Sequence, residues 1–198
     1  MKKLVLSLSF CVFFYSCGEV ASGDGTGSDG VATLEHRIFA SSSTHNGNLG
    51  GASGADTICQ NLATAAGLSR SYEALVSTDS EDADDKLSFS GAIYIVDSSD
   101  EKTLVAGSGS ELWGTDSANL TARINVDEDG NTISTTNNTW TGTNSDGGNQ
   151  VGRNCSNWSS SSISDDGFYG NTDSFSATWV ENNFEDCANT NRIYCVSQ

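Results

Sequence analysis

Residues 53–67 read SGADTICQNLATAAG, and this stretch decides the fold. Ser53 is the predicted N-cap of a helix, with Asp56 as the acid of a capping box. Gly67 is the predicted C-terminal cap. The apolar residues recur at intervals of three and four, which places them on one stripe: Ala55, Ile58, Cys59, Leu62 and Ala66. The helix is therefore expected to pack this stripe, Cys59 included, against a core.

Short strand-like runs lie on both sides of the helix. Residues 37–40 precede it, and residues 72–76 alternate apolar and polar side chains directly after it. An acidic stretch, 80–87, is expected to contain a short helix. The other predicted strands are 92–96, 123–126, 139–143 and 192–196. Loops rich in Gly, Ser, Asn and Asp separate them, and without any proline Gly and Asn must supply the turns.

The first 16 residues have the form of a bacterial signal peptide. Two lysines are followed by a mostly apolar run, 4–15, which is shorter than the roughly 20 residues a membrane-spanning helix needs. The Ser16–Cys17 junction resembles a lipoprotein-processing box, so Cys17 is expected to become the acylated N-terminus of the mature chain. The alternative is an ordinary signal peptide followed by a chance cysteine.

A flexible tether and one folded domain are expected after the signal peptide. Residues 17–33 are rich in Gly, Ser and Asp and contain no aromatic residue, so they cannot bury enough surface to fold. Aromatic residues are spread through 34–198, which predicts a single domain by length. The pattern indicates an α+β fold with short strands, one main helix after the first strand, and long loops.

The chain is strongly acidic, with a formal net charge of −17. Because Lys2 and Lys3 belong to the signal peptide, the mature chain has seven basic residues against 26 acidic ones. This balance argues against nucleic acid, heparin-like chains and anionic lipid as partners, so contact with the membrane is expected through the lipid anchor only. It favours basic partners or divalent cations, although solubility outside the cell explains the charge equally well.

Four cysteines remain in the domain: Cys59, Cys155, Cys187 and Cys195. An even number of cysteines in an exported chain predicts two disulfides. Three pairings are possible, and the spacings alone do not choose among them. No pair has the CxxC spacing typical of zinc sites, so a zinc site is not expected.

A series of short motifs occurs in a recognisable order. They are NGNLGG (46–51), GADTIC (54–59), AGL (66–68), YEALVS (72–77), ARIN (122–125), WTGTNSDG (140–147), CSNW (155–158), Cys187 and RIYC (192–195). This order resembles the endostatin-like branch of the C-type-lectin-like fold. More closely, it is similar to the leptospiral endostatin-like outer-membrane lipoprotein family, and the resemblance covers most of residues 37–198.

The resemblance implies a disulfide pairing, a location and a function. The bridges would be nested, Cys59–Cys195 and Cys155–Cys187. The protein would be lipid-anchored in the cell envelope, in the outer membrane and exposed at the surface. It would act as an adhesin for host extracellular-matrix proteins or serum proteins such as complement regulators and plasminogen. Binding would use the exposed loops between about residues 87 and 186.

Two further functions stay open: a glycan-binding lectin-like module and a structural envelope lipoprotein. Calcium-dependent sugar-binding relatives use a proline-containing loop, which this chain lacks. A candidate calcium site consists of Asp127, Asp129 and Asn131, which alternate around Gly130 in the spacing that hard cations favour. A solvated acidic turn is the preferred interpretation of the same residues, and no other cofactor is expected.

Catalysis is not expected. The chain contains neither GxSxG nor HExxH. His36 and His45 are the only histidines, and both are expected to be exposed on a loop or strand. The four tryptophans could form a sugar-binding surface, but core packing is the predicted role for at least two or three of them: Trp113, Trp140, Trp158 and Trp179.

Overall fold

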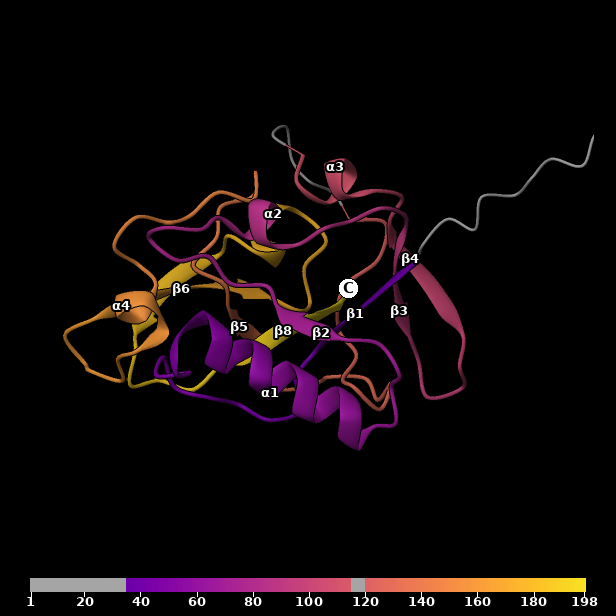
Figure 1. Cartoon of the computed structure of the whole chain (residues 1–198), viewed down its shortest axis with the longest axis horizontal. Helices are drawn as coiled ribbons and strands as arrows, with labels where there is room; N and C mark the ends of the chain where they lie inside the picture. The colour runs from indigo at the N-terminus through magenta and orange to yellow at the C-terminus, as the bar shows by residue number, and fades with distance from the viewer. Residues whose placement is uncertain (1–34, 115–119) are drawn as a thin grey trace, which may run out of the picture. The chain divides into compact units, whose positions relative to one another are not determined.

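The computed structural model describes residues 35–114 and 120–198. The predicted signal peptide, the predicted lipidation site Cys17 and the predicted tether lie outside the described residues. The described part is a mixed α+β structure with a sheet of eight strands (Figure 1). The strands are β1 (His36–Ala40), β2 (Tyr72–Ala74), β3 (Ile93–Val96), β4 (Lys102–Ala106), β5 (Asn138–Trp140), β6 (Asp166–Asn171), β7 (Asn183–Asp186) and β8 (Arg192–Ser197).

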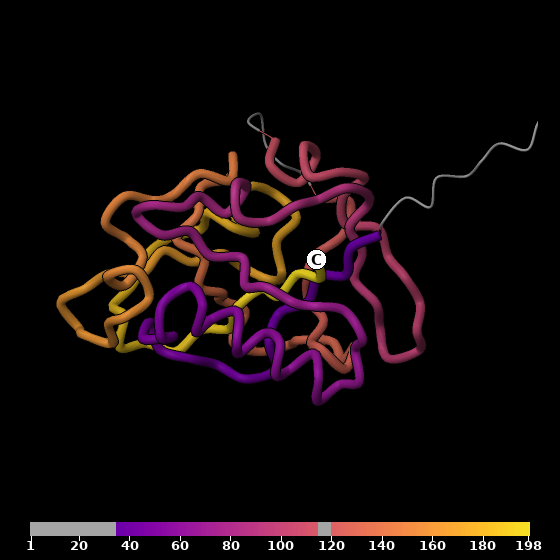
Figure 2. Tube along the Cα trace, viewed as in Figure 1, coloured from indigo at the N-terminus to yellow at the C-terminus, as the bar shows by residue number. Residues whose placement is uncertain are grey.

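The last strand, β8, is the centre of the sheet. The strand order is β4-β3-β1-β8-β5-β6-β7, and β2 also pairs with β8. Cys195 of β8 pairs with Phe39 of β1 and with Ala74 of β2, both antiparallel. Figure 2 shows the first described strand, in indigo, beside the yellow C-terminal strand. The fold therefore closes only when the two ends of the described chain meet.

The helices are mostly short. They are α1 (Gly51–Ala65), α2 (Ala83–Lys86), α3 (Gly109–Leu112), α4 (Cys155–Trp158) and the 3₁₀ helix η1 (Ala177–Trp179). The long helix, α1, lies along β2 and β8 (Figure 1). Its buried residues are Ala55, Cys59 and Ala63. The predicted apolar stripe is thus confirmed at Ala55 and Cys59, while Ile58 and Leu62 pack against the same core at its edge.

The predicted role of Gly67 at the end of this helix is confirmed, and the predicted N-cap is wrong. The N-cap is Gly50, in a left-handed conformation with φ of 83°, and Ser53 lies inside the helix. At the other end Ala66 is the C-cap, and Gly67 follows it with φ of 74°. The Gly67 and Leu68 N–H groups donate to Thr64 O and Ala63 O, which is the Schellman arrangement. The helix begins earlier than predicted because two glycines, rather than a side-chain cap, turn the chain into it.

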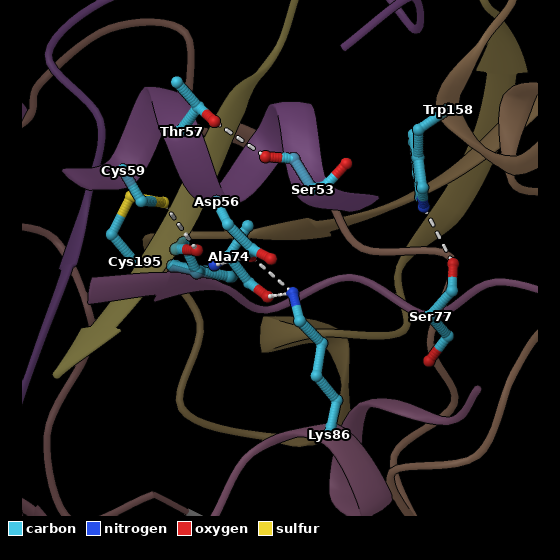
Figure 3. Close-up of polar contacts among 10 residues, drawn as sticks. Ser53, Asp56, Thr57, Cys59, Ala74, Ser77, Lys86, Trp158 and Cys195 are labelled. Atoms are coloured by element: carbon cyan, nitrogen blue, oxygen red, sulfur yellow. Dashed lines mark hydrogen bonds and ion pairs between the residues drawn. A yellow bond between two sulfur atoms is a disulfide. The ribbon is translucent and has the colours of Figure 1, made fainter. Parts of the chain in front are cut away.

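Asp56 is not a capping acid. Its Oδ1 accepts hydrogen bonds from the Ala74 N–H at 2.8 Å and from Lys86 Nζ at 2.5 Å. Lys86 Nζ also donates to the Ala74 carbonyl at 2.8 Å (Figure 3). One carboxylate therefore joins α1, β2 and α2.

Five predicted strands and the short acidic helix are confirmed, and one strand prediction is wrong. Residues 123–126 form no strand; only Val126 makes an isolated bridge, to Thr132. Ile124 is nevertheless fully buried. Its apolar character reflects core packing in a loop rather than sheet pairing. The strands β4, β6 and β7 have no counterpart among the predicted elements.

Three of the four tryptophans are completely buried in the core. Trp140, Trp158 and Trp179 have no exposed surface, and Trp113 packs partly buried against the same core. Core packing is thus confirmed as the role of these side chains. Among the helices of the described ranges, none combines the length and apolar character needed to cross a bilayer.

Candidate functional site

The four predicted disulfide cysteines form two bridges, Cys59–Cys195 and Cys155–Cys187. This is the nested pairing that the resemblance implies. The Cα atoms are 5.3 and 5.6 Å apart, in the normal range. The first bridge links α1 to β8, and the second links α4 to the residue that follows β7. The second bridge therefore closes the loop-rich segment between those elements.

The short helix α4 is left-handed. Residues 155–158 have φ values of 51, 54, 58 and 60°, a conformation that costs L-residues roughly 1–2 kcal/mol each. Asn154 offsets part of this cost, because its Oδ1 accepts from the Asn157 N–H at 2.9 Å. Trp158 is buried and donates from Nε1 to the Ser77 carbonyl at 2.8 Å (Figure 3). The turn is therefore held by its neighbours rather than by local preference.

Asp79 fastens this turn to the loop after β2. Its two carboxylate oxygens accept from Asn154 Nδ2 at 2.7 Å and Asn157 Nδ2 at 3.1 Å. The Asp79 N–H in turn donates to Asn157 Oδ1 at 2.7 Å. Together with the disulfide, these bonds fix the start of a segment that we call the 151–184 segment.

The 151–184 segment carries all the large apolar side chains that the described part exposes: Val151, Ile163, Phe175 and Phe184. Val151 is 84 % exposed and Ile163 75 % exposed. The Arg153 guanidinium carbon lies 3.4 Å from the centre of the Phe184 ring, close enough for a cation–π contact. Large exposed apolar and aromatic side chains are candidate contacts for a protein partner.

The three predicted calcium ligands lie in one turn, which follows Val126. Asp127 Oδ1 accepts from the Asp129 N–H at 3.0 Å and the Asn131 N–H at 2.8 Å. Asn131 Nδ2 lies 3.3 Å from Asp127 Oδ2. The structure thus brings these residues together and shows the Asp127 carboxylate already bonded within the turn. Calcium binding there stays a prediction.

We expect Asp127→Ala to lower the free energy of unfolding by about 1–2 kcal/mol in the absence of calcium, because two N–H groups lose their acceptor. Urea unfolding with chelator and with calcium measures this. Asp129→Ala is the control, because no hydrogen bond involving its carboxylate is found in the described structure. A calcium-dependent gain in the wild type that vanishes in Asp127→Ala would mean that the carboxylate binds calcium as well.

A second acidic cluster was not among the predicted sites. Side-chain oxygens of Asp82, Asp84 and Asp85 lie within 4.8 Å of one another. Burial raises the pKa of Asp84, and repulsion from Asp85 and Asp82 raises it further. Asp82 is bonded to the backbone and side chain of Asn149. The sequence signal is the Asp-Ala-Asp-Asp run, but an exposed acidic cluster assigns no site by itself.

The histidine predictions are wrong on exposure. His36 is 4 % exposed, and its ring bonds to the Ser197 carbonyl at 2.7 Å. The Phe89 ring packs against it, with the two ring centres 5.5 Å apart. His45 is partly buried, burial lowers its pKa, and its Nε2 lies 2.9 Å from the exposed Ser43 hydroxyl. The His36 ring therefore belongs to the interior of the fold, and the His45 ring lies at its edge.

Neither a comparison with protein-family models nor a search of curated proteins finds a match to this chain. The structure and the sequence pattern therefore carry the functional argument.

Proposed function

We propose that this protein is a lipid-anchored binding module of the endostatin-like, C-type-lectin-like class that holds other proteins through its 151–184 segment and catalyses no reaction. Cys17 would carry the anchor, and the outer face of the outer membrane would be its location. The order of sequence motifs supports this class, and the pairing of the four cysteines agrees with it.

One observation carries the proposal of a protein partner. The exposed large apolar side chains of the described structure all fall within 151–184, and a disulfide and the Asp79 hydrogen bonds fix the beginning of that segment. A fixed apolar side chain loses little freedom on binding and gains the burial of its surface. Val151 and Ile163 are the strongest candidates for such contacts.

Host extracellular-matrix or serum proteins are the proposed partners. The chain carries a formal charge of −17, so a basic patch on the partner would be attracted to it and would bind faster at low salt. The apolar contacts would then set the lifetime of the complex. The association rate should therefore depend on the salt concentration, and the dissociation rate on Val151 and Ile163.

We expect the purified full chain to bind at least one protein of an immobilised matrix and serum panel saturably, with or without calcium. Val151→Ser and Ile163→Ser together should weaken this binding by roughly tenfold or more, because both would be buried in the interface. Surface plasmon resonance gives both rate constants. Ala65→Ser, on the exposed side of α1, is the matched control and should change neither rate.

Three results would count against this function. Unchanged affinity in the double variant would move the contact elsewhere on the molecule. Binding to a glycan array that is lost when a chelator is added would favour the lectin-like alternative. The sugar would then have to contact residues other than the three fully buried tryptophans. Protection of the domain from protease on intact cells would favour a structural envelope protein.

A further inference from the structure

A cavity of about 320 Å³ lies where β1, β3 and β4 meet the loop after α1. Its polar lining includes Arg37, Arg70 and Lys102. Its apolar lining includes Leu68 and Val96, and two tyrosine rings complete it: Tyr72 and Tyr94. These residues come from parts of the sheet and loop distinct from the 151–184 segment.

Positive charge is concentrated in this cavity. Outside the predicted signal peptide the chain has seven basic residues, and three of them line this one cavity. Glu35 is the only acidic residue among the lining residues. In a chain of net charge −17 this local excess of positive charge makes the cavity the favoured place for a small anion.

Arg37 has an N–H group without a partner. Its Nη2 donates to the Glu128 carbonyl at 2.8 Å, but its Nε is buried and has no hydrogen-bond partner among the described residues. A buried donor left unpaired costs free energy, and one attached to a charged group costs more than a neutral one. The buried Nε offers no surface to the cavity, so Arg37 attracts an anion there through the positive charge of its guanidinium.

Among the residues that the structure describes, Glu35 is the hydrogen-bonding partner of the other two cations. Lys102 Nζ pairs with the Glu35 carboxylate, and Arg70 Nη1 donates to the Glu35 carbonyl. Both partners of the ion pair are about half exposed, so the pair contributes little to stability. The carboxylate of a ligand can therefore compete with the Glu35 carboxylate for Lys102, and it would be attracted by the positive charges of both Lys102 and Arg70.

The rest of the lining suits a ring. Lys102 Nζ lies 5.8 Å from the centre of the Tyr94 ring. Tyr94 and Val96 both belong to β3. Burial raises the pKa of Tyr72, and the positive charges of Arg37 and Arg70 oppose that rise. The cavity volume is at the lower end of the range for small-molecule sites, about 300–1,000 Å³.

We propose that this cavity binds a small organic acid, with its carboxylate between Arg37 and Arg70 and its ring against Tyr94. Two probe ligands distinguish the possible classes of acid: benzoate is an aromatic acid, and glucuronate is a sugar acid. The proposal does not depend on the 151–184 segment, and either site can bind without the other.

Titrating the purified full chain with each acid, followed by ¹H–¹⁵N NMR and calorimetry, tests the proposal. At least one acid should bind with one-to-one stoichiometry and shift the amides of residues 35–37, 68–70 and 94–96. Arg70→Gln should weaken binding roughly tenfold, because it removes a charge-assisted contact. Lys102→Gln should weaken binding less, because it removes only the attraction of a nearby charge. Both residues are exposed, so the variants should remain folded.

Two matched variants make the outcome decisive. Arg123→Gln removes the same charge from a cation that lies outside the cavity and pairs with Asp173, and should leave binding unchanged. Glu35→Gln removes the competing carboxylate and should strengthen binding severalfold. Benzyl alcohol, the neutral analogue of benzoate, should not bind. The proposal is overturned if neither acid binds at millimolar concentration, if benzyl alcohol binds as well as benzoate, or if Arg123→Gln weakens binding as much as Arg70→Gln.

Discussion

Replacing Cys59 and Cys195 together by alanine is expected to lower the free energy of unfolding by about 3–5 kcal/mol. The bridge joins residues 136 positions apart, so its loss frees most of the described chain in the unfolded state. Both cysteines are fully buried between α1 and β8 (Figure 3). Urea unfolding followed by tryptophan fluorescence is a suitable measurement, because three tryptophans are buried in the folded state.

The other bridge provides the comparison. Cys155 and Cys187 are separated by 32 positions, and in the chain-entropy model this shorter loop makes their bridge about 1 kcal/mol less stabilising. The paired alanine variant at these positions should therefore lose less stability. The opposite order would mean that the Cys155–Cys187 bridge acts on the folded state, through the left-handed turn that begins at Cys155.

The sequence predicted the elements whose signals are local. The spacing of apolar residues identified α1, alternation identified β2, and the closing strand β8 was predicted as well. The start of α1 was misplaced because two glycines, Gly50 and Gly51, turn the chain into the helix before Ser53. The Leu49 N–H also donates to the Trp158 carbonyl, and a Cβ at Gly54 would lie 2.2 Å from the Leu49 carbonyl oxygen. The glycines are visible in the sequence, whereas the contact with Trp158 is not.

Of the three missed strands, β4 reads KTLVA and contains strand-favouring residues, whereas the other two lack a local signal. β6 reads DGFYGN and β7 reads NFED, both rich in residues that strands disfavour. β6 pairs with β5 and with β7, and the Cys155–Cys187 bridge lies beside β6 and β7. Their conformation follows from long-range pairing, which single-sequence patterns do not contain.

The candidate sites divide in the same way. The turn at residues 127–131 could be predicted, because its residues are neighbours in the sequence. The cavity proposed to bind an anion could not, because its cations come from three separate places, at Arg37, Arg70 and Lys102. The sequence showed that basic residues are few, but not that the sheet brings three of them together.

Asp56→Asn is expected to destabilise the protein by about 2–4 kcal/mol, because it leaves the Lys86 ammonium without its carboxylate. The Lys86 side chain is only 8 % exposed, so water cannot replace the lost partner fully. The asparagine Oδ1 can still accept from the Ala74 N–H, so the change tests the charge and not the backbone contact. Urea unfolding at neutral pH measures the loss.

Asp173→Asn is the control, because its ion pair with Arg123 is exposed and should contribute less than about 1 kcal/mol. Lys86→Met should restore part of the stability when added to Asp56→Asn, since it removes the unpaired buried charge. A loss in Asp56→Asn no larger than in the control would show that Lys86 finds another partner. That result would also remove the reason to regard Asp56 as the residue that holds α1 against β2 and α2, and would leave the Cys59–Cys195 bridge as the main link between the long helix and the sheet.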